Sequence, residues 1–175
     1  MKKGILIILF SIISINFSQS QNKIKFKPGI ELIENNFKTE YKNPESILFV
    51  FNVVGCEANY YMNLAKNLKK RFKKSNTKVK FNFEINTTLE IEQIPKKKYS
   101  ENDFELTCFI STSNMNSWDN HLIEKRKQNY DLNLIFEKIS TKENTGKITL
   151  NINSYYTIIT QNKNSSKLIC ELITE

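Results

Sequence analysis

The chain has 175 residues, with 26 lysine and arginine side chains against 18 aspartate and glutamate, a formal net charge of +8. A chain of this length buries about two-thirds of its unfolded surface, so it needs no disulfide or metal to fold as one domain. One histidine, three cysteines and four glycines exclude a multi-histidine metal site, a disulfide-dense scaffold and a glycine-rich phosphate loop.

The first twenty residues have the pattern of a cleavable secretory signal peptide. Lys2 and Lys3 form its positive start, residues 4–17 form an apolar run, and Ser18 and Ser20 give the small-x-small pattern that signal peptidase accepts. The apolar run is shorter than the roughly 20 residues that span a bilayer, although an uncleaved membrane anchor is the alternative. We therefore predict export to the periplasm or the exterior. Because the run is followed by no nearby cysteine, no lipid anchor is expected.

Residues 21–45 are expected to be a lead-in segment or linker, because Pro28-Gly29 interrupts a short alternation of apolar residues. A single domain is expected over residues 46–175. Residues 47–54 are almost continuously apolar, which is typical of a central strand buried on both faces. A helix is predicted over residues 57–74, and lysines occupy much of its outer surface. Its buried stripe is expected to consist of Tyr61, Leu64, Ala65, Leu68 and Phe72.

The next strand is predicted from strict alternation of apolar and polar residues. The inward residues are Val79, Phe81, Phe83 and Ile85, and the pattern resumes at Leu89 and Ile91. Pro95 and the three lysines after it predict a solvated loop, and residues 104–111 predict another strand. Residues 112–129 are either a short helix capped by Ser117 or an irregular connection.

A strand is predicted over residues 130–136, a turn over 143–146, and a partner strand over 148–158. A short helix over residues 165–174 is expected to close the chain. The predicted fold class is α/β (α+β), with a mixed sheet of about five strands. A long helix after the first strand and the short C-terminal helix are expected on one face. The other face is expected to be partly polar, through Lys80, Asn82, Glu84, Asn133, Asn151 and Asn153.

Three cysteines, Cys56, Cys108 and Cys170, permit one disulfide and one free thiol in an exported protein. Alternatively, all three are small buried side chains. Cys108 lies on the apolar face of its predicted strand, and Cys170 lies among apolar residues of the terminal helix, so both are expected in the core. Cys56 differs, because it stands where the first strand meets the first helix. A thiol at a helix N-terminus meets the positive end of the helix dipole, which favours the reactive thiolate.

Three stretches of the sequence follow the order of a known class of domain. They are ILFVFNVVGCEANYYMNLAKNLKKRF, YDLNLIFEKISTKENTGKITLNI and SSKLICELI. A strand with a long helix, a late hairpin containing Thr-Gly, and a closing helix resemble the small periplasmic domains of the amino-terminal TolB and curli-assembly lipoprotein type. The resemblance covers most of the mature chain and implies a non-catalytic binding or assembly role in the cell envelope. It transfers no site residue, and this chain lacks the lipid-anchor cysteine of the lipoprotein members.

The shorter stretch FVFNVVGCEAN resembles a thioredoxin-type strand that ends at an active-site turn. Cys56-Glu57-Ala58-Asn59 stands where such proteins carry Cys-x-x-Cys, so Asn59 takes the place of the resolving cysteine. The resemblance implies that a Cys56 thiolate attacks disulfides without the usual intramolecular release. Pro95 is the available candidate for the later cis-proline of that fold.

His121 is the one histidine, so a nucleophilic pair would need Cys56 or Cys108 beside it and Asp119 to orient the ring. Nothing in the spacing supports such a pair. A surface histidine in a polar loop is the commoner case.

The charged residues give no stronger candidate. Glu90 and Glu92 share one side of a strand, an arrangement that is usually solvated. The basic excess is spread along the chain, and the lysine-rich helix face is interpreted as solvated rather than as a nucleic-acid site.

Two hypotheses follow from the sequence. The leading one is a non-catalytic exported module that binds a protein partner through its sheet edge or its polar face, with no cofactor and no metal. The alternative is a thiol-dependent redox protein that uses Cys56.

Overall fold

The computed structural model describes residues 27–53, 57–85, 94–114 and 128–175. The predicted signal peptide and most of the connection predicted over 112–129 lie outside the described residues. The strands are β1 (Ile30–Asn35), β2 (Ser46–Val53), β3 (Lys78–Ile85), β4 (Leu106–Ser113), β5 (Gln128–Lys138) and β6 (Glu143–Ser154). The helices are α2 (Ala58–Phe72) and α3 (Ile158–Thr174), with 3-10 turns η1 (Thr39–Tyr41) and η3 (Glu101–Asp103).

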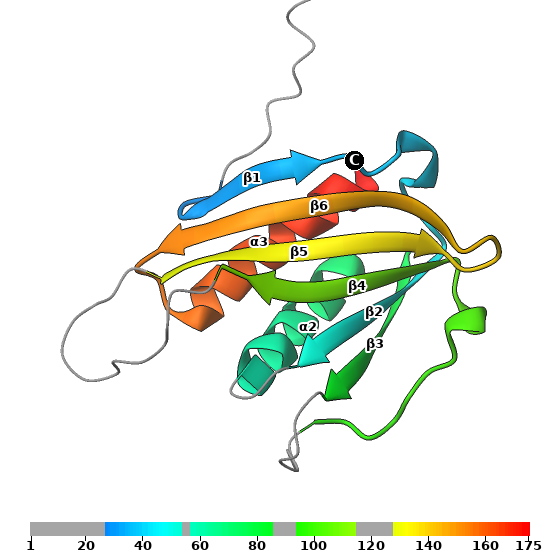
Figure 1. Cartoon of the computed structure of the whole chain (residues 1–175), viewed down its shortest axis with the longest axis horizontal. Coiled ribbons are helices and arrows are strands. Elements are labelled where there is room, and N and C mark those ends of the chain that lie inside the picture. The colour runs from blue at the N-terminus through cyan, green and yellow to red at the C-terminus, as the bar shows by residue number, and fades with distance from the viewer. Residues whose placement is uncertain (1–26, 54–56, 86–93, 115–127) are drawn as a thin grey trace, which may run out of the picture.

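The strands form one mixed sheet in the order β1-β6-β5-β4-β2-β3 (Figure 1). β2 pairs in parallel with β3 on one side and with β4 on the other, whereas the remaining pairs are antiparallel. α2 and α3 lie side by side against one face of the sheet. This arrangement confirms the predicted α+β class and the predicted helices on one face. The sheet has six strands rather than about five.

The additional strand, β1, lies within the residues for which the sequence predicts a lead-in or linker. Ile30 and Leu32 pair opposite Ile152 and Leu150 of β6, the last strand in the chain. β1 also contacts α3, so its apolar side adds to the core. A six-residue strand whose partner lies so far along the chain gives only a weak local signal.

The hairpin that joins β5 to β6 turns at residues 139–142, before the predicted turn at 143–146. Gly146 instead lies inside β6, opposite Phe136, with a φ of +146°. A Cβ atom at Gly146 would lie 2.4 Å from the Cα of Phe37. The glycine therefore marks a close approach of two backbone segments rather than a turn.

The terminal helix α3 begins at Ile158, before the predicted start at residue 165. Its cap is Thr157, whose side chain accepts a hydrogen bond from the Thr160 N–H, with an N–O distance of 3.4 Å. Threonine is a preferred N-cap residue, so this start was readable in the sequence. The alternation that places Ile158 in a strand is therefore wrong, because β6 ends at Ser154.

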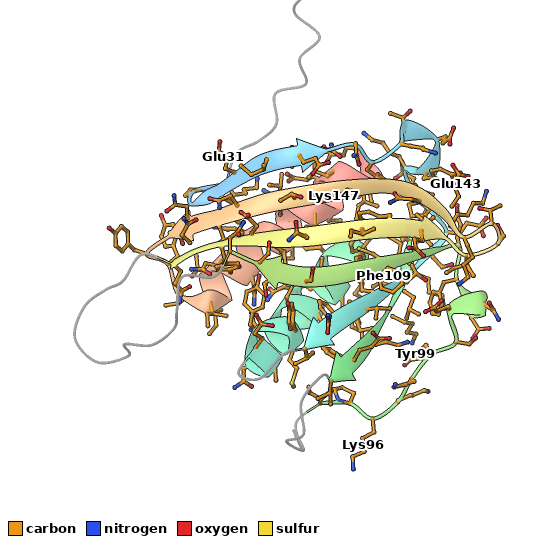
Figure 2. All side chains as sticks on the ribbon, viewed as in Figure 1. Glu31, Lys96, Tyr99, Phe109, Glu143 and Lys147 are labelled. Carbon is orange, nitrogen blue, oxygen red and sulfur yellow. The ribbon has the colours of Figure 1, made fainter. Side chains whose placement is uncertain are left out.

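The face of the sheet opposite the helices is lined by a ladder of amide and hydroxyl side chains. Figure 2 shows Phe109 and Lys147 on this face, with both helices behind the sheet. The Asn133 amide donates to Ser113 Oγ (2.9 Å), and the Asn151 amide donates to Asp131 Oδ1 (2.7 Å). These bonds join β4, β5 and β6 side by side, as the alternation of polar residues predicts.

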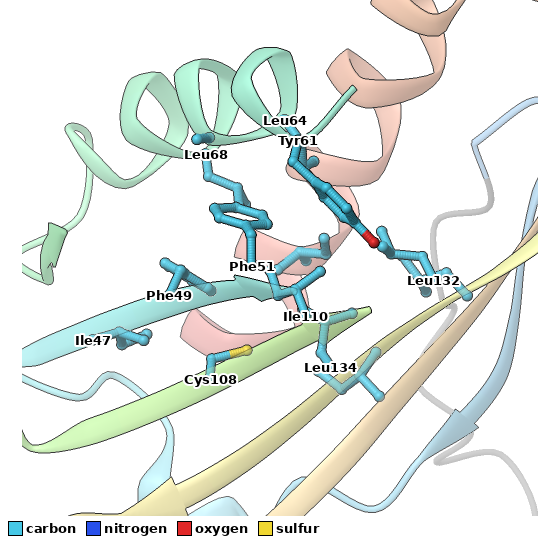
Figure 3. Packing of buried hydrophobic residues seen from close by; sticks show 14 of the residues in the cluster. Ile47, Phe49, Phe51, Tyr61, Leu64, Leu68, Cys108, Ile110, Leu132 and Leu134 are labelled. Carbon is cyan, nitrogen blue, oxygen red and sulfur yellow. The ribbon is translucent and has the colours of Figure 1, made fainter. Parts of the chain in front are cut away.

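The main core lies between the other face of the sheet and the two helices. Figure 3 shows Phe49 and Phe51 of β2 packed beneath Tyr61 and Leu68 of α2, with Cys108 of β4 close by. The predicted helical stripe is confirmed, because its five members are all buried. Burying Leu64, Leu68 and Phe72 contributes roughly 1.5–3 kcal/mol each, so this face fixes α2 on the sheet.

Within the described residues, neither helix is both long and apolar enough to cross a membrane.

Candidate functional site

A concave site lies beside β3, the strand at one edge of the sheet. It is a groove of about 250 Å³ between α2 and the segment of residues 94–105, which we call the strap. The strap runs from beyond β3 back to the start of β4 (Figures 1 and 2). The described residues that line the groove are Met62, Ala65, Lys66 and Lys69 of α2, Val79, Lys80, Phe81 and Phe83 of β3, and Pro95, Lys97 and Tyr99 of the strap.

The floor of the groove is apolar because apolar residues recur at helical spacing in α2 and alternate with polar residues in β3. Met62 and Ala65 follow each other at helical spacing, beside the buried stripe of α2. Phe81 lies on the helix side of β3 and stacks on Phe49, with ring centroids 5.7 Å apart. Val79 and Phe81 are only half-buried, because no described strand lies beyond β3 to cover them.

The strap forms the second wall, and Asn82 of β3 fastens it. The Asn82 side-chain amide donates to the Tyr99 carbonyl (2.9 Å), and its oxygen accepts from the Tyr99 N–H (2.9 Å). Phe104 then packs on Leu48 and Val50 of β2, on the face opposite the helices. A single buried side chain therefore satisfies both backbone groups of Tyr99 and holds the strap over the sheet.

The rim of the groove is positively charged. The Lys80 and Lys97 ammonium groups lie 5.1 Å and 5.2 Å from the centroid of the Tyr99 ring, within the range of cation–π attraction. Lys66 and Lys69 stand exposed on the opposite wall. Among the described residues, none of these four lysines takes part in an ion pair.

The net positive charge of the chain comes from one stretch, in which Lys66, Lys69 and Lys80 line the groove. Residues 58–83 contain eight lysine and arginine residues and no aspartate or glutamate, so the rest of the chain carries equal numbers of the two. The sequence-based view of a basic excess spread along the chain is therefore wrong. A one-signed cluster of this kind attracts acidic partners and speeds their association, and salt weakens the effect.

The predicted reactive residue, Cys56, lies outside the described residues, as do His121, Glu90 and Glu92. Both described cysteines are free thiols.

Cys108 is fully buried, and burial raises its pKa well above the ordinary value, which keeps the thiol protonated. Its predicted place in the core is confirmed. Cys170 is half-buried, and burial raises its pKa as well.

A hydrogen-bonded cluster occupies the ends of the parallel strands, where α2 begins. Glu57 accepts from the Thr112 hydroxyl, and the Tyr61 hydroxyl lies 3.1 Å from the same Thr112 oxygen. The Tyr130 hydroxyl donates to Gln161 of α3 (2.9 Å). Burial raises the pKa of Tyr61 and Tyr130, so both remain neutral donors. The cluster ties both helix starts to the sheet.

No group of three or more His, Cys, Asp or Glu side chains within the described ranges is placed to hold a metal ion. The groove is thus the arrangement that offers a ligand both apolar contact and complementary charge. Sequence reasoning named the sheet edge in general terms but missed the groove residues. Their signal was present, since β3 combines alternating aromatic residues with lysines, yet its position at the edge is a property of the whole sheet.

No family model and no curated protein matches this chain. Its fold is similar to that of PelC from Paraburkholderia phytofirmans, solved as a dodecamer. One crystal form gives a TM-score of 0.51 at 8% identity, covering 83% of this chain and 97% of PelC. A form carrying one substitution gives 0.50 at 6% identity, covering 83% and 98%. At such identities the likeness shows the fold alone. A neuraminyllactose-binding hemagglutinin homologue from Helicobacter pylori gives only 0.42 at 9% identity, covering 79% and 87%.

Proposed function

We propose that this protein is an exported, non-catalytic binding or assembly module of the bacterial cell envelope, and that it holds a protein partner in the groove beside β3. The observation that carries the proposal is the combination of a sheet edge with no described strand beyond it, a half-buried apolar floor and a rim of four lysines in one groove. Surfaces that combine exposed apolar area with a charged rim are typical of sites for other molecules.

Two further observations support a role in assembly. PelC, which has a similar fold, is a dodecamer in its crystals, so this architecture is compatible with building larger assemblies. The apolar run and small-x-small pattern of residues 1–20 support export, and with it a partner in the periplasm or outside the cell.

The test compares two double variants of α2. Lys66→Gln with Lys69→Gln removes two charges from the groove, whereas Lys70→Gln with Lys74→Gln removes two exposed charges from the same helix but away from the groove lining. Each protein is expressed with its signal peptide in the producing bacterium, cross-linked in the envelope and purified with whatever it holds.

The wild type and the Lys70/Lys74 variant are expected to retain the same cross-linked partner, and the Lys66/Lys69 variant to lose most of it. Retention by all three proteins would show that the groove is not the binding site. Mass spectrometry of the purified wild type tests export at the same time, because cleavage after Ser20 leaves Gln21 as the first residue.

A further inference from the structure

Building on the proposed function, we infer that the groove accepts an extended acidic segment of the partner, which joins the sheet as a seventh strand beside β3. The inference combines three properties of the site: a regular strand edge with no described strand beyond it, walls that lie on both sides of that edge, and lysines on both walls.

The edge of β3 is suited to strand pairing. All eight residues of β3 pair with β2 in one continuous register without a bulge, and none of them is a proline. Backbone N–H and C=O groups that face away from β2 are therefore regularly spaced, and such edges readily accept another strand. The opposite edge of the sheet is less suited, because the register of β1 shifts between Leu32 and Glu34.

The walls of the groove give an added strand two different environments. Side chains on one face of an added strand would meet Met62 and Ala65 of α2, and those on the other face would meet Pro95 and Tyr99 of the strap. Successive side chains of a strand point to opposite faces, so an extended segment fills both sides at once. A helix uses its backbone groups for its own hydrogen bonds, so it could not bond to the N–H and C=O groups of β3 that face away from β2.

The lysines of the groove favour an acidic partner segment. Lys66 and Lys69 on one wall and Lys80 and Lys97 on the other bracket the position of the added strand. Two copies of this protein pairing through β3 would bring these lysines together, which is unfavourable. Acidic residues in the incoming strand would instead find opposite charge on both sides. The partner segment is therefore expected to combine acidic residues with apolar ones, and not to come from a second β3 edge.

The test uses purified mature protein and defined probes. The main probe is an eight-residue peptide in which glutamate alternates with valine, matched in length to β3. The first control has the same sequence with every backbone amide N-methylated, which keeps the charge but removes the N–H donors from both edges of the strand. The second has lysine in place of glutamate, and the third is a single-stranded oligonucleotide of equal charge. Affinities are measured by fluorescence anisotropy, and hydrogen exchange is followed along β3.

The glutamate peptide is expected to bind and to slow exchange of the β3 amides that face away from β2. N-methylation of the peptide is expected to weaken binding at least about tenfold. The Lys66→Gln, Lys69→Gln variant is expected to bind the unmodified peptide about tenfold more weakly than the wild type. The Lys70→Gln, Lys74→Gln variant is expected to differ from the wild type by less than about twofold. Equal affinity for the N-methylated peptide would overturn strand addition. If the oligonucleotide binds more tightly than the glutamate peptide and displaces it, the groove is a nucleic-acid surface instead.

The experiments can refute strand addition and the proposed function separately. If no peptide binds while the Lys66/Lys69 variant still loses its envelope partner, strand addition is wrong and the binding function stands. If that variant keeps its envelope partner, the proposed function itself is wrong.

Discussion

Asn82 is expected to control whether the strap stays on the sheet. In Asn82→Ala, the N–H and the carbonyl of Tyr99 both lose their partner. Each such hydrogen bond contributes about 1 kcal/mol net, so the strap loses about 2 kcal/mol of local stability. Because about 1.4 kcal/mol corresponds to a tenfold change in an equilibrium constant, opening of the strap should become roughly 30-fold more frequent.

Hydrogen exchange at Tyr99 reports the loss of this contact, because the Tyr99 amide hydrogen is bonded to Asn82 itself. Exchange at Tyr99 is expected to accelerate at least roughly 30-fold in Asn82→Ala, while the β4 amides keep their wild-type rates. Asn133→Ala is the matched control, since Asn133 bonds to Ser113 on the same face but does not contact the strap.

Unchanged exchange at Tyr99 would refute the role of Asn82. Equal acceleration of Tyr99 and the β4 amides would show that the strap opens only when the whole domain unfolds.

Three further predictions follow from the fold. Gly146→Ala should lower the free energy of unfolding by about 3 kcal/mol or more in urea titrations, because its Cβ would meet the Phe37 backbone at 2.4 Å and a φ of +146° is strained for alanine; a loss below about 1 kcal/mol would contradict that close approach. Burial raises the pKa of Tyr60, Tyr61 and Tyr130, so above the ordinary tyrosine pKa of about 10 the unfolded chain ionises first and stability falls as pH rises. Tyrosinate absorbance from these residues should appear in one cooperative step with unfolding, and gradual ionisation in a folded protein would count against their burial. In native alkylation, Cys108 should remain unmodified until the protein unfolds, because burial raises its pKa and blocks access. Fast alkylation of Cys56 with a lowered pKa in the same experiment would favour the redox hypothesis. Slow alkylation of Cys56 would leave the binding function as the remaining hypothesis.

Periodicity in the sequence was sufficient for those elements whose residues alternate between core and solvent over many positions. The stripe of α2 and the alternation of β5 are strong patterns, since each side chain faces either water or the core along the whole element. The parallel β2–α2–β3 unit followed from the same patterns. Single-residue signals were less informative. Gly146 favoured a turn in the sequence. In the structure a glycine is needed there because the Phe37 backbone lies too close for a Cβ atom, and the two residues meet only in the folded chain.

By itself, the sequence determined the class of the fold, the buried faces of its main elements and the total basic charge, because these depend on composition and local spacing. The tertiary structure decided that β3 lies at the sheet edge, that Asn82 fastens the strap, and that the lysines of α2, β3 and the strap surround one groove. Strand order is set by pairing between residues far apart in the chain. A site made of three separate segments therefore becomes visible only after the chain has folded.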